Sequence, residues 1–234
     1  MAYNINSVIT YNYLYAVPMS IVQKGGTNTG GVVAYNIINN PQWDGVNVKG
    51  MDNVNIFNIT FYTAQQFYYN GVGTGEGLVE IYKNDNPLHT SHGTHIYNNI
   101  FYTANQIDVI RLDETDDQNG FQSDYNLFYC ESGTPMFQIY NTRYTFAQWQ
   151  ELGYDTHSVV TNPNFNDIIN FVPSAALRYG TKSEWGTGLA GNATWSTSVL
   201  PATDSQDGIW QVGARILSSR EATAHQKQIK GQTQ

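Results

Sequence analysis

The chain has 234 residues, enough for one domain with a substantial core. Its formal net charge is −8, which disfavours nucleic acid and anionic membranes as partners, because both need a basic surface. No run approaches the roughly 18 consecutive apolar residues of a membrane-spanning helix. Charged residues make up only 13% of the chain and aromatic residues 14%, a composition that favours short strands joined by tight turns.

The first half of the chain contains internal repeats. The segment NIFNITFYTA (55–64) recurs as HIYNNIFYTA (95–104), 40 residues later. Alternation of apolar and polar residues is typical of a half-buried strand, and spacings of roughly 20 residues or more fit the coils of a solenoid. Several alternating stretches end in an aromatic residue followed by Asn, namely Tyr11-Asn12, Tyr35-Asn36, Phe57-Asn58, Tyr97-Asn98 and Tyr125-Asn126.

The repeated Asn has a structural explanation. Asn tolerates the left-handed backbone conformation and can bond its own backbone at a sharp corner. Stacked at one corner of successive coils, these side chains would form a ladder of amide hydrogen bonds, predicted for Asn12, Asn36, Asn58, Asn98 and Asn126. Asn58 also begins a glycosylation sequon, but the ladder is the simpler interpretation.

A second class of strand follows roughly ten residues after most of these Asn residues. Its members are SIVQKGG (20–26), GVNVKGM (45–51), LVEIYKND (78–85), IDVIRLDE (107–114) and MFQIYN (136–141). Longer segments at 65–76, 84–94 and 114–120 interrupt this spacing and predict loops that project beside these strands.

The C-terminal third changes character. The spacing of Phe146, Trp149 and Leu152 predicts a short amphipathic helix within 144–153, with Gly153 after its end. GIWQVGARI (208–216) predicts a closing strand, and the single Cys130 predicts a buried thiol. We expect an all-β fold: a right-handed parallel β-helix, that is, a single-stranded solenoid of about five coils plus a C-terminal closing segment with one short helix. It would span residues 1–217, with a polar tail at 218–234.

An ordered series of segments resembles a known family. The series is SDYN (123–126), TFAQWQ (145–150), DTHSVV (155–160), NPNF (162–165) and VGAR (212–215). Over roughly residues 8–217 the chain resembles the secreted bacterial right-handed parallel β-helix proteins of the pectate-lyase-like superfamily. The resemblance implies a protein that handles polysaccharides and is secreted or held at the cell surface. That superfamily includes lyases, glycoside hydrolases and epimerases.

The start of the chain departs from that pattern. Such domains usually begin with an amphipathic cap and several coils, whereas here a coil strand follows within a few residues, without the basic and apolar regions of an export signal. We therefore expect that N-terminal coils and the signal are missing from this sequence. The first coil would then be covered by missing residues, by a partner, or by end-to-end self-association.

The second strand class supplies the candidate site. Val46 and Val48 pointing inward leave Asn47 and Lys49 outward, and the same alternation exposes Glu80, Tyr82, Arg111 and Asp113. A polysaccharide lyase needs a base, a donor to the leaving oxygen and a group that neutralises the uronate. The predicted catalytic residues are Lys49, Tyr82 and Arg111. The predicted substrate-binding residues are Lys24, Asn47, Glu80, and the aromatic Trp43, Tyr68 and Tyr69, whose rings can stack on sugars.

Two further groups have alternative interpretations. The acidic run of Asp113, Glu114, Asp116 and Asp117 is a candidate Ca²⁺ site, with a solvated turn as the alternative. His157 paired with Asp155 would suit acid–base chemistry, with a packed turn as the alternative.

The sequence therefore leaves three functions open. The first is an enzyme acting on a polysaccharide by β-elimination or glycoside hydrolysis. The second is a non-catalytic glycan-binding or adhesin β-helix, and the third is an inactive fragment of a larger enzyme. An anionic uronate polymer would need a locally basic groove or bound Ca²⁺ against the net charge of −8, whereas a neutral glycan would need neither.

Overall fold

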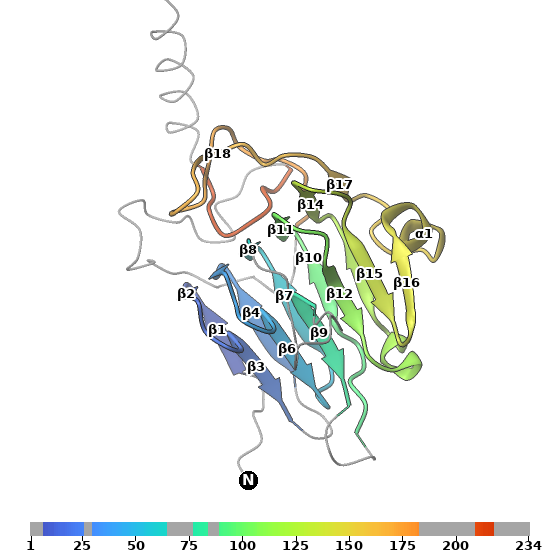
Figure 1. Cartoon of the computed structure of the whole chain (residues 1–234). Coiled ribbons are helices and arrows are strands. Elements are labelled where there is room, and N and C mark those ends of the chain that lie inside the picture. Colours follow the sequence, from blue (N-terminus) through green and yellow to red (C-terminus); the bar gives the residue numbers. More distant parts are fainter. Residues whose placement is uncertain (1–6, 26–29, 65–76, 84–88, 183–208, 218–234) are drawn as a thin grey trace, which may run out of the picture.

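The protein is an all-β solenoid. The structure, a computed structural model, describes residues 7–25, 30–64, 77–83, 89–182 and 209–217, with the backbone alone at Asp116. Mostly parallel sheets stack as a β-solenoid of about four turns with one short helix, which confirms the predicted fold class (Figure 1). The first sheet contains five strands, but the solenoid makes about four turns where the Asn repeats predicted about five coils.

Three sheets form the walls of the solenoid, and each turn contributes one strand to each of them. The first sheet contains β1 (Ser7–Thr10), β4 (Gly31–Ala34), β7 (Val54–Phe57), β10 (His95–Tyr97) and β13 (Gln122–Asp124). The second contains β2 (Tyr13–Tyr15), β5 (Ile37–Asn39), β8 (Thr60–Thr63), β11 (Ile100–Thr103), β14 (Leu127–Cys130) and β17 (Val159–Val160). The third contains β3 (Ile21–Lys24), β6 (Val46–Lys49), β9 (Val79–Tyr82), β12 (Asp108–Leu112), β15 (Met136–Ile139) and β16 (Thr142–Thr145).

Beyond the last coil, the chain leaves the parallel pattern. β16 pairs antiparallel with β15 and leads directly into α1 (Phe146–Glu151). The helix is shorter than the predicted segment because Tyr144 and Thr145 belong to β16. Thr145 and Gln148 form a capping box at the start of α1. Gly153 follows in the left-handed region, as predicted. The remaining elements are a 3₁₀ helix (Thr115–Gln118) and the antiparallel pair β18 (Phe165–Asp167) and β19 (Val172–Pro173).

The corner between the first and second sheets corrects the predicted ladder. Its first residue has positive φ in every turn, namely Tyr11, Tyr35, Asn58, Asn98 and Tyr125. The ladder position is the residue that follows. Asn12, Asn36, Asn99 and Asn126 form the ladder, and Ile59 occupies the same position in the third turn. Asn58 and Asn98 are therefore not ladder residues: Phe57 ends β7 and Tyr97 ends β10, so each Asn takes the left-handed position, which Asn tolerates.

The interior is a column of stacked aromatic and aliphatic side chains. Phe61, Phe101 and Phe128 occupy the same register position in β8, β11 and β14. Their rings stack with centroid distances of 4.8 Å and 5.1 Å, and Phe137 meets Phe128 edge-on at 5.2 Å. Each such pair contributes about 0.5–1.5 kcal/mol beyond the area it buries. Cys130 is buried beside this column, as predicted.

The C-terminal segment lies across the second sheet. Residues 208–216 were predicted as a closing strand, but the described residues 209–217 form no strand. Gly213 turns the chain at φ 83°, and the backbone of the segment bonds to Leu177, Gly180 and Asn98. Asn58 Nδ2 donates to the carbonyl oxygens of Gln211 and Gly213, and Thr60 Oγ1 accepts from the Ala214 N–H. The predicted tail at 218–234 lies outside the described residues, and none of the described helices is long and apolar enough to span a membrane.

The opposite end of the stack consists of edge strands. β1, β2 and β3 are the outer strands of the three sheets in the described part of the chain. Asn12 is exposed there, whereas Asn36, Asn99 and Asn126 are fully buried. Coverage of this end by further coils, a partner or another copy stays a prediction.

Candidate functional site

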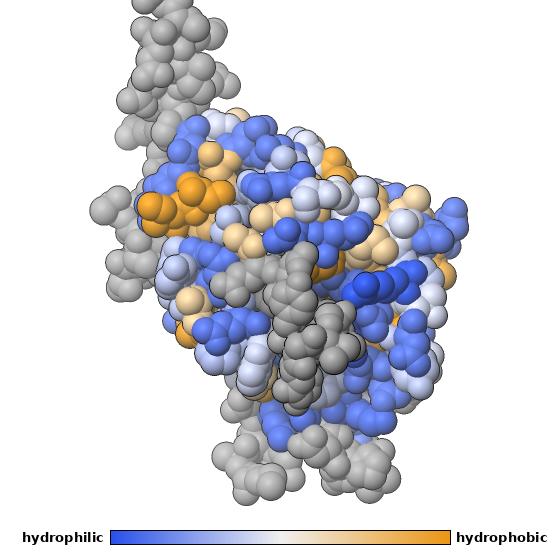
Figure 2. Space-filling model, in the orientation of Figure 1, coloured by the Kyte–Doolittle hydropathy of each residue, from blue (hydrophilic) through white to orange (hydrophobic). Residues whose placement is uncertain are grey.

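The outward face of the third sheet brings the predicted site residues together. Lys24, Lys49 and Tyr82 occupy one register position in β3, β6 and β9, so they form one outward row. The second row passes from Asn47 through Glu80 and Arg111 to Gln138. In Figure 2 hydrophilic residues gather where Figure 1 shows β12, β15 and β16. The register read from the sequence is thus confirmed for this sheet, but Asn47 (1% exposed) and Glu80 (8% exposed) are buried and not exposed as predicted.

A buried carboxyl group that the sequence reasoning missed lies beside these rows. Asp44 precedes β6, is 3% exposed, and accepts a hydrogen bond from Asn47 Nδ2 at 2.8 Å. It is held there by Gly45, whose N–H donates to the Leu78 carbonyl oxygen at 3.0 Å. A Cβ at Gly45 would lie 2.7 Å from that oxygen and 2.8 Å from the Phe61 ring, so only glycine permits this close approach.

A second carboxyl group lies near Asp44. Glu80, which is 8% exposed, is close enough to affect the pKa of Asp44. Burial raises the pKa of Asp44, against the lowering effect of Asn47, Glu80 and the Arg111 charge. Asp44 therefore keeps its proton to a higher pH than an ordinary Asp.

Arg111 is held between two acidic side chains. Its Nε lies 3.5 Å from Glu80 Oε1, and its Nη2 lies 2.6 Å from Asp113 Oδ1. Asp108, buried in the same strand, is bound by Arg143 through Nε at 3.0 Å and Nη2 at 2.8 Å. Arg111 and Arg143 are therefore already paired with carboxylates, and Arg111 is not poised as a lone partner for a uronate.

Lys49 and Tyr82 form the polar edge of the site. Lys49 Nζ lies 4.8 Å from the centre of the Tyr82 ring, a cation–π contact. Burial raises the pKa of Tyr82, while a hydrogen bond with Asn47 and the Lys49 charge oppose the rise. The phenol thus stays protonated at neutral pH and is suited to donate a hydrogen bond.

The remaining predicted binding residues fall into two groups. Trp43 is 38% exposed beside Asp44, and Lys24 is exposed in the Lys49 row, so both can contact a ligand on this face. Tyr68 and Tyr69 lie outside the described residues.

Asp113, Glu114 and Asp117 of the acidic run each have a different partner. Asp113 pairs with Arg111, and Glu114 pairs with Lys83 at 2.5 Å. Asp117 accepts hydrogen bonds from the N–H groups of Ser91 and Glu114, at 3.2 Å and 3.0 Å. In the described part of the chain no three His, Cys, Asp or Glu side chains form a metal-binding group. Because the Asp116 side chain is not described, the Ca²⁺ site stays a prediction.

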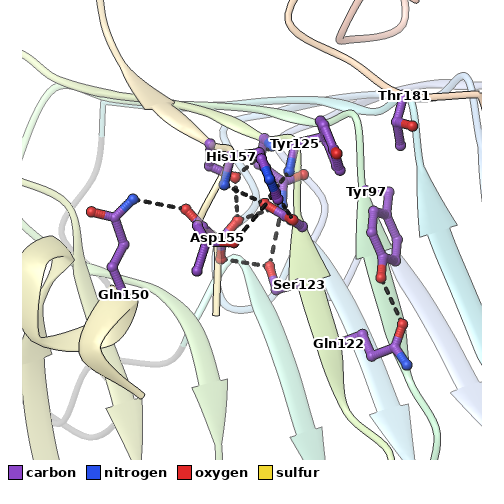
Figure 3. Close-up of polar contacts among 12 residues, drawn as sticks. Tyr97, Gln122, Ser123, Tyr125, Gln150, Asp155, His157 and Thr181 are labelled. Atoms are coloured by element: carbon purple, nitrogen blue, oxygen red, sulfur yellow. Dashed lines mark hydrogen bonds and ion pairs between the residues drawn. The ribbon is translucent and has the colours of Figure 1, made fainter. Parts of the chain in front are cut away.

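A second polar cluster lies where the ladder ends (Figure 3). The buried Asp155 carboxylate accepts four side-chain hydrogen bonds, from Ser123, Asn126, Trp149 and Ser158, at 2.6–2.9 Å. Burial raises its pKa, and these bonds oppose the rise. Because all four partners are structural, Asp155 caps the ladder and anchors α1 through Trp149.

The sequence had suggested that His157 pairs with Asp155. In the structure it pairs with Asp124 instead. Its Nδ1 lies 2.6 Å from Asp124 Oδ2, whereas both Asp155 oxygens are occupied by the ladder. The reason is spatial: His157 lies one turn above Tyr125, so the outward Asp124 is its neighbour in the stack.

Asp44, Asp108 and Asp124 were missed by sequence reasoning for different reasons. Asp44 lies in a turn, where strand alternation says nothing about direction. Asp108 lies at an irregularity in the β12–β15 pairing, which interrupts the alternation. Asp124 is outward in β13, and only its register with the following turn identifies His157 as its partner.

Comparison with known proteins adds no relative. No protein-family model, curated protein or solved structure matches the chain.

Proposed function

We propose that the chain binds a neutral polysaccharide along the outward face of the third sheet and hydrolyses a glycosidic bond with the Asp44–Glu80 pair. The buried carboxyl groups of Asp44 and Glu80, with the raised pKa of Asp44, carry the proposal. Glycoside hydrolysis needs one carboxylic acid to protonate the leaving oxygen and one carboxylate to assist the attack. Trp43 supplies an exposed ring for a sugar face, and Asn47 and Tyr82 supply polar groups beside the pair.

The choice of a neutral substrate follows from charge. The predicted neutraliser, Arg111, is already paired with Glu80 and Asp113, and the chain carries a net charge of −8. A uronate polymer would bring further negative charge to Asp44, Glu80 and Asp113. Neutral sugars avoid this repulsion.

The test is release of reducing ends from a panel of neutral glycans and uronate polymers. The wild-type chain should release them from a neutral glycan, and Asp44→Asn or Glu80→Gln should lower the rate by at least about a hundredfold. Asp52→Asn, a carboxylate outside the two rows, is the matched control and should keep the full rate. Urea midpoints of all variants separate loss of activity from loss of folding.

β-Elimination is the second candidate, because Lys49 lies against Tyr82 in the same face. It would give a conjugated product that absorbs in the ultraviolet on uronate polymers, with Lys49→Ala inactive. Absence of both reducing ends and ultraviolet absorbance across the panel would leave only the binding function.

A further inference from the structure

A second candidate site lies on the first sheet, away from the Asp44–Glu80 pair. Asp124 points outward from the end of β13, and His157 occupies the corresponding corner of the next turn, after α1. The His157 ring stacks on the Tyr125 ring at 4.8 Å with an interplanar angle of 4° (Figure 3). The stacking fixes the plane of the imidazole.

The Asp124 carboxylate is fixed by three donors. Oδ1 accepts from the N–H groups of Tyr125 at 2.9 Å and of His157 at 2.7 Å, and Oδ2 lies 2.6 Å from His157 Nδ1. A carboxylate oxygen can only accept, so Nδ1 carries the proton of this bond. The neutral ring therefore has its lone pair on Nε2.

The lone pair on Nε2 is directed away from the carboxylate. The His157 side chain is 61% exposed, and none of the described residues is hydrogen bonded to Nε2. The groups that contact the ring are Asp124, Tyr125 and Thr156, while the buried Asp155 is engaged with the ladder. An imidazole with Nδ1 anchored and Nε2 open is an oriented base.

His92 and Asp52 provide a comparison with His157 and Asp124 in the same chain. His92 also lies near a carboxylate, but its Nδ1 is 3.8 Å from Asp52 Oδ1, too far for a hydrogen bond. Its Nε2 is bonded to Thr90 Oγ1 at 2.7 Å. The same residue types are thus present without an oriented, open Nε2.

We propose that His157 is a general base for hydrolysis of carboxylic esters on the outward face of the first sheet, and that Asp124 is its positioning residue. Nε2 takes a proton from a water molecule as the water oxygen attacks the ester carbonyl carbon. The tetrahedral intermediate then expels the alkoxide, which receives that proton from Nε2, so ester and water become acid and alcohol. The site suits an uncharged ester, because the charged groups next to it are the acidic Asp124 and Asp155, which would repel a phosphate ester.

The test uses p-nitrophenyl acetate, an uncharged activated ester, and the full chain. His157→Gln should lower the rate attributable to the protein by about tenfold. Asp124→Asn should lower it nearly as much, because the amide donor facing Nδ1 moves the ring proton to Nε2. His92→Gln and Asp52→Asn are the matched controls and should leave the rate unchanged.

Separate measurements of kcat, KM and stability distinguish positioning from folding. Asp124→Asn should lower kcat with little change in KM, while its urea midpoint shows a folded chain. A full rate in His157→Gln, or an equal loss in His157→Gln and His92→Gln, would overturn the proposal. A full rate in Asp124→Asn would overturn the role given to Asp124. The reaction uses no residue of the third sheet, so this proposal stands or fails independently of the glycosidase proposal.

Discussion

At the scale of single residues, the interior corner of each turn decides how the coils are joined. Asn99 accepts from the Ile59 N–H at 2.9 Å and donates to the Ile56 carbonyl oxygen and to Asn126 Oδ1. Asn126 makes the same type of bond to the Ile96 carbonyl oxygen. The ladder is interrupted at Ile59, which shows that an apolar residue fits at this place but provides no acceptor for the turn below.

Replacing a buried ladder residue should be costly, and replacing the exposed one should not. Asn99→Ile leaves the buried Ile59 N–H without its acceptor, so we expect the free energy of unfolding to fall by about 1–3 kcal/mol. Asn12→Ile, at the exposed end, should change it by less than about 0.5 kcal/mol. Urea unfolding measures both. Equal losses in the two variants would contradict the ladder described above.

Asp117 should make stability depend on pH. Burial raises its pKa to about 7 from the ordinary value of 3.8. Between these values the folded chain keeps a proton that the unfolded chain has lost, so the contribution is complete below about pH 4 and disappears as the pH rises through about 7. We expect unfolding to be easier at about pH 8 than at about pH 5, by about 1–3 kcal/mol.

The Asp117→Asn variant isolates this contribution. Asn does not titrate, so the difference in urea midpoint between the two pH values should narrow. It need not vanish, because burial also raises the pKa of Asp108 and Asp44. An unchanged difference would assign the pH dependence to those other groups.

Strand alternation predicted side-chain direction well and corner positions poorly. It placed Lys49, Glu80, Tyr82 and Arg111 on one face because a strand alternates strictly. A corner has no such period. Phe57-Asn58 and Tyr35-Asn36 are both an aromatic residue followed by Asn, but the residue with positive φ is the Asn in the first pair and the Tyr in the second. Contacts from later turns, such as His157 on Asp124, were not predictable from local patterns.

At the scale of elements, two Asn residues with positive φ, Asn58 and Asn98, hold the chain that crosses the second sheet at residues 209–217 and at Thr181. Asn98 Nδ2 donates to the Thr181 carbonyl oxygen at 2.7 Å, and Asn98 Oδ1 accepts from the Thr181 N–H at 2.8 Å. Asn58 Nδ2 donates to the carbonyl oxygens of Gln211 and Gly213. The side chain of a left-handed corner residue points outward, so these positions face the segment that crosses the second sheet.

Asn98→Ala should loosen that segment without unfolding the coils. It removes both hydrogen bonds to Thr181, and we expect faster trypsin cleavage after Arg178 and Lys182. Asn55→Ala, which removes an outward hydrogen bond to His95 on the first sheet, is the matched control. If trypsin cleaved both variants at the wild-type rate, Asn98 would not be what holds the segment.

At the scale of the whole molecule, the solenoid presents two polar faces on a common apolar interior. The second sheet is covered by the C-terminal segment, while the Asp124–His157 pair lies on the outward side of the first sheet and the buried Asp44 and Glu80 lie at the third. An apolar patch is exposed between β18 and β19, where Ile168 and Ile169 lie (Figure 2). The repeat pattern in the sequence was enough to predict this architecture, because each coil buries its apolar face only against its neighbours.

The location of glycan binding tests the central claim most directly. Crystals of the Glu80→Gln variant, soaked with an oligosaccharide of the neutral glycan that the wild-type chain cleaves best, would show the site. We predict density for the sugar over the third sheet, against Trp43, Asn47 and Tyr82, with the scissile bond beside Asp44. Sugar density confined to another face, with the third sheet empty, would contradict the account.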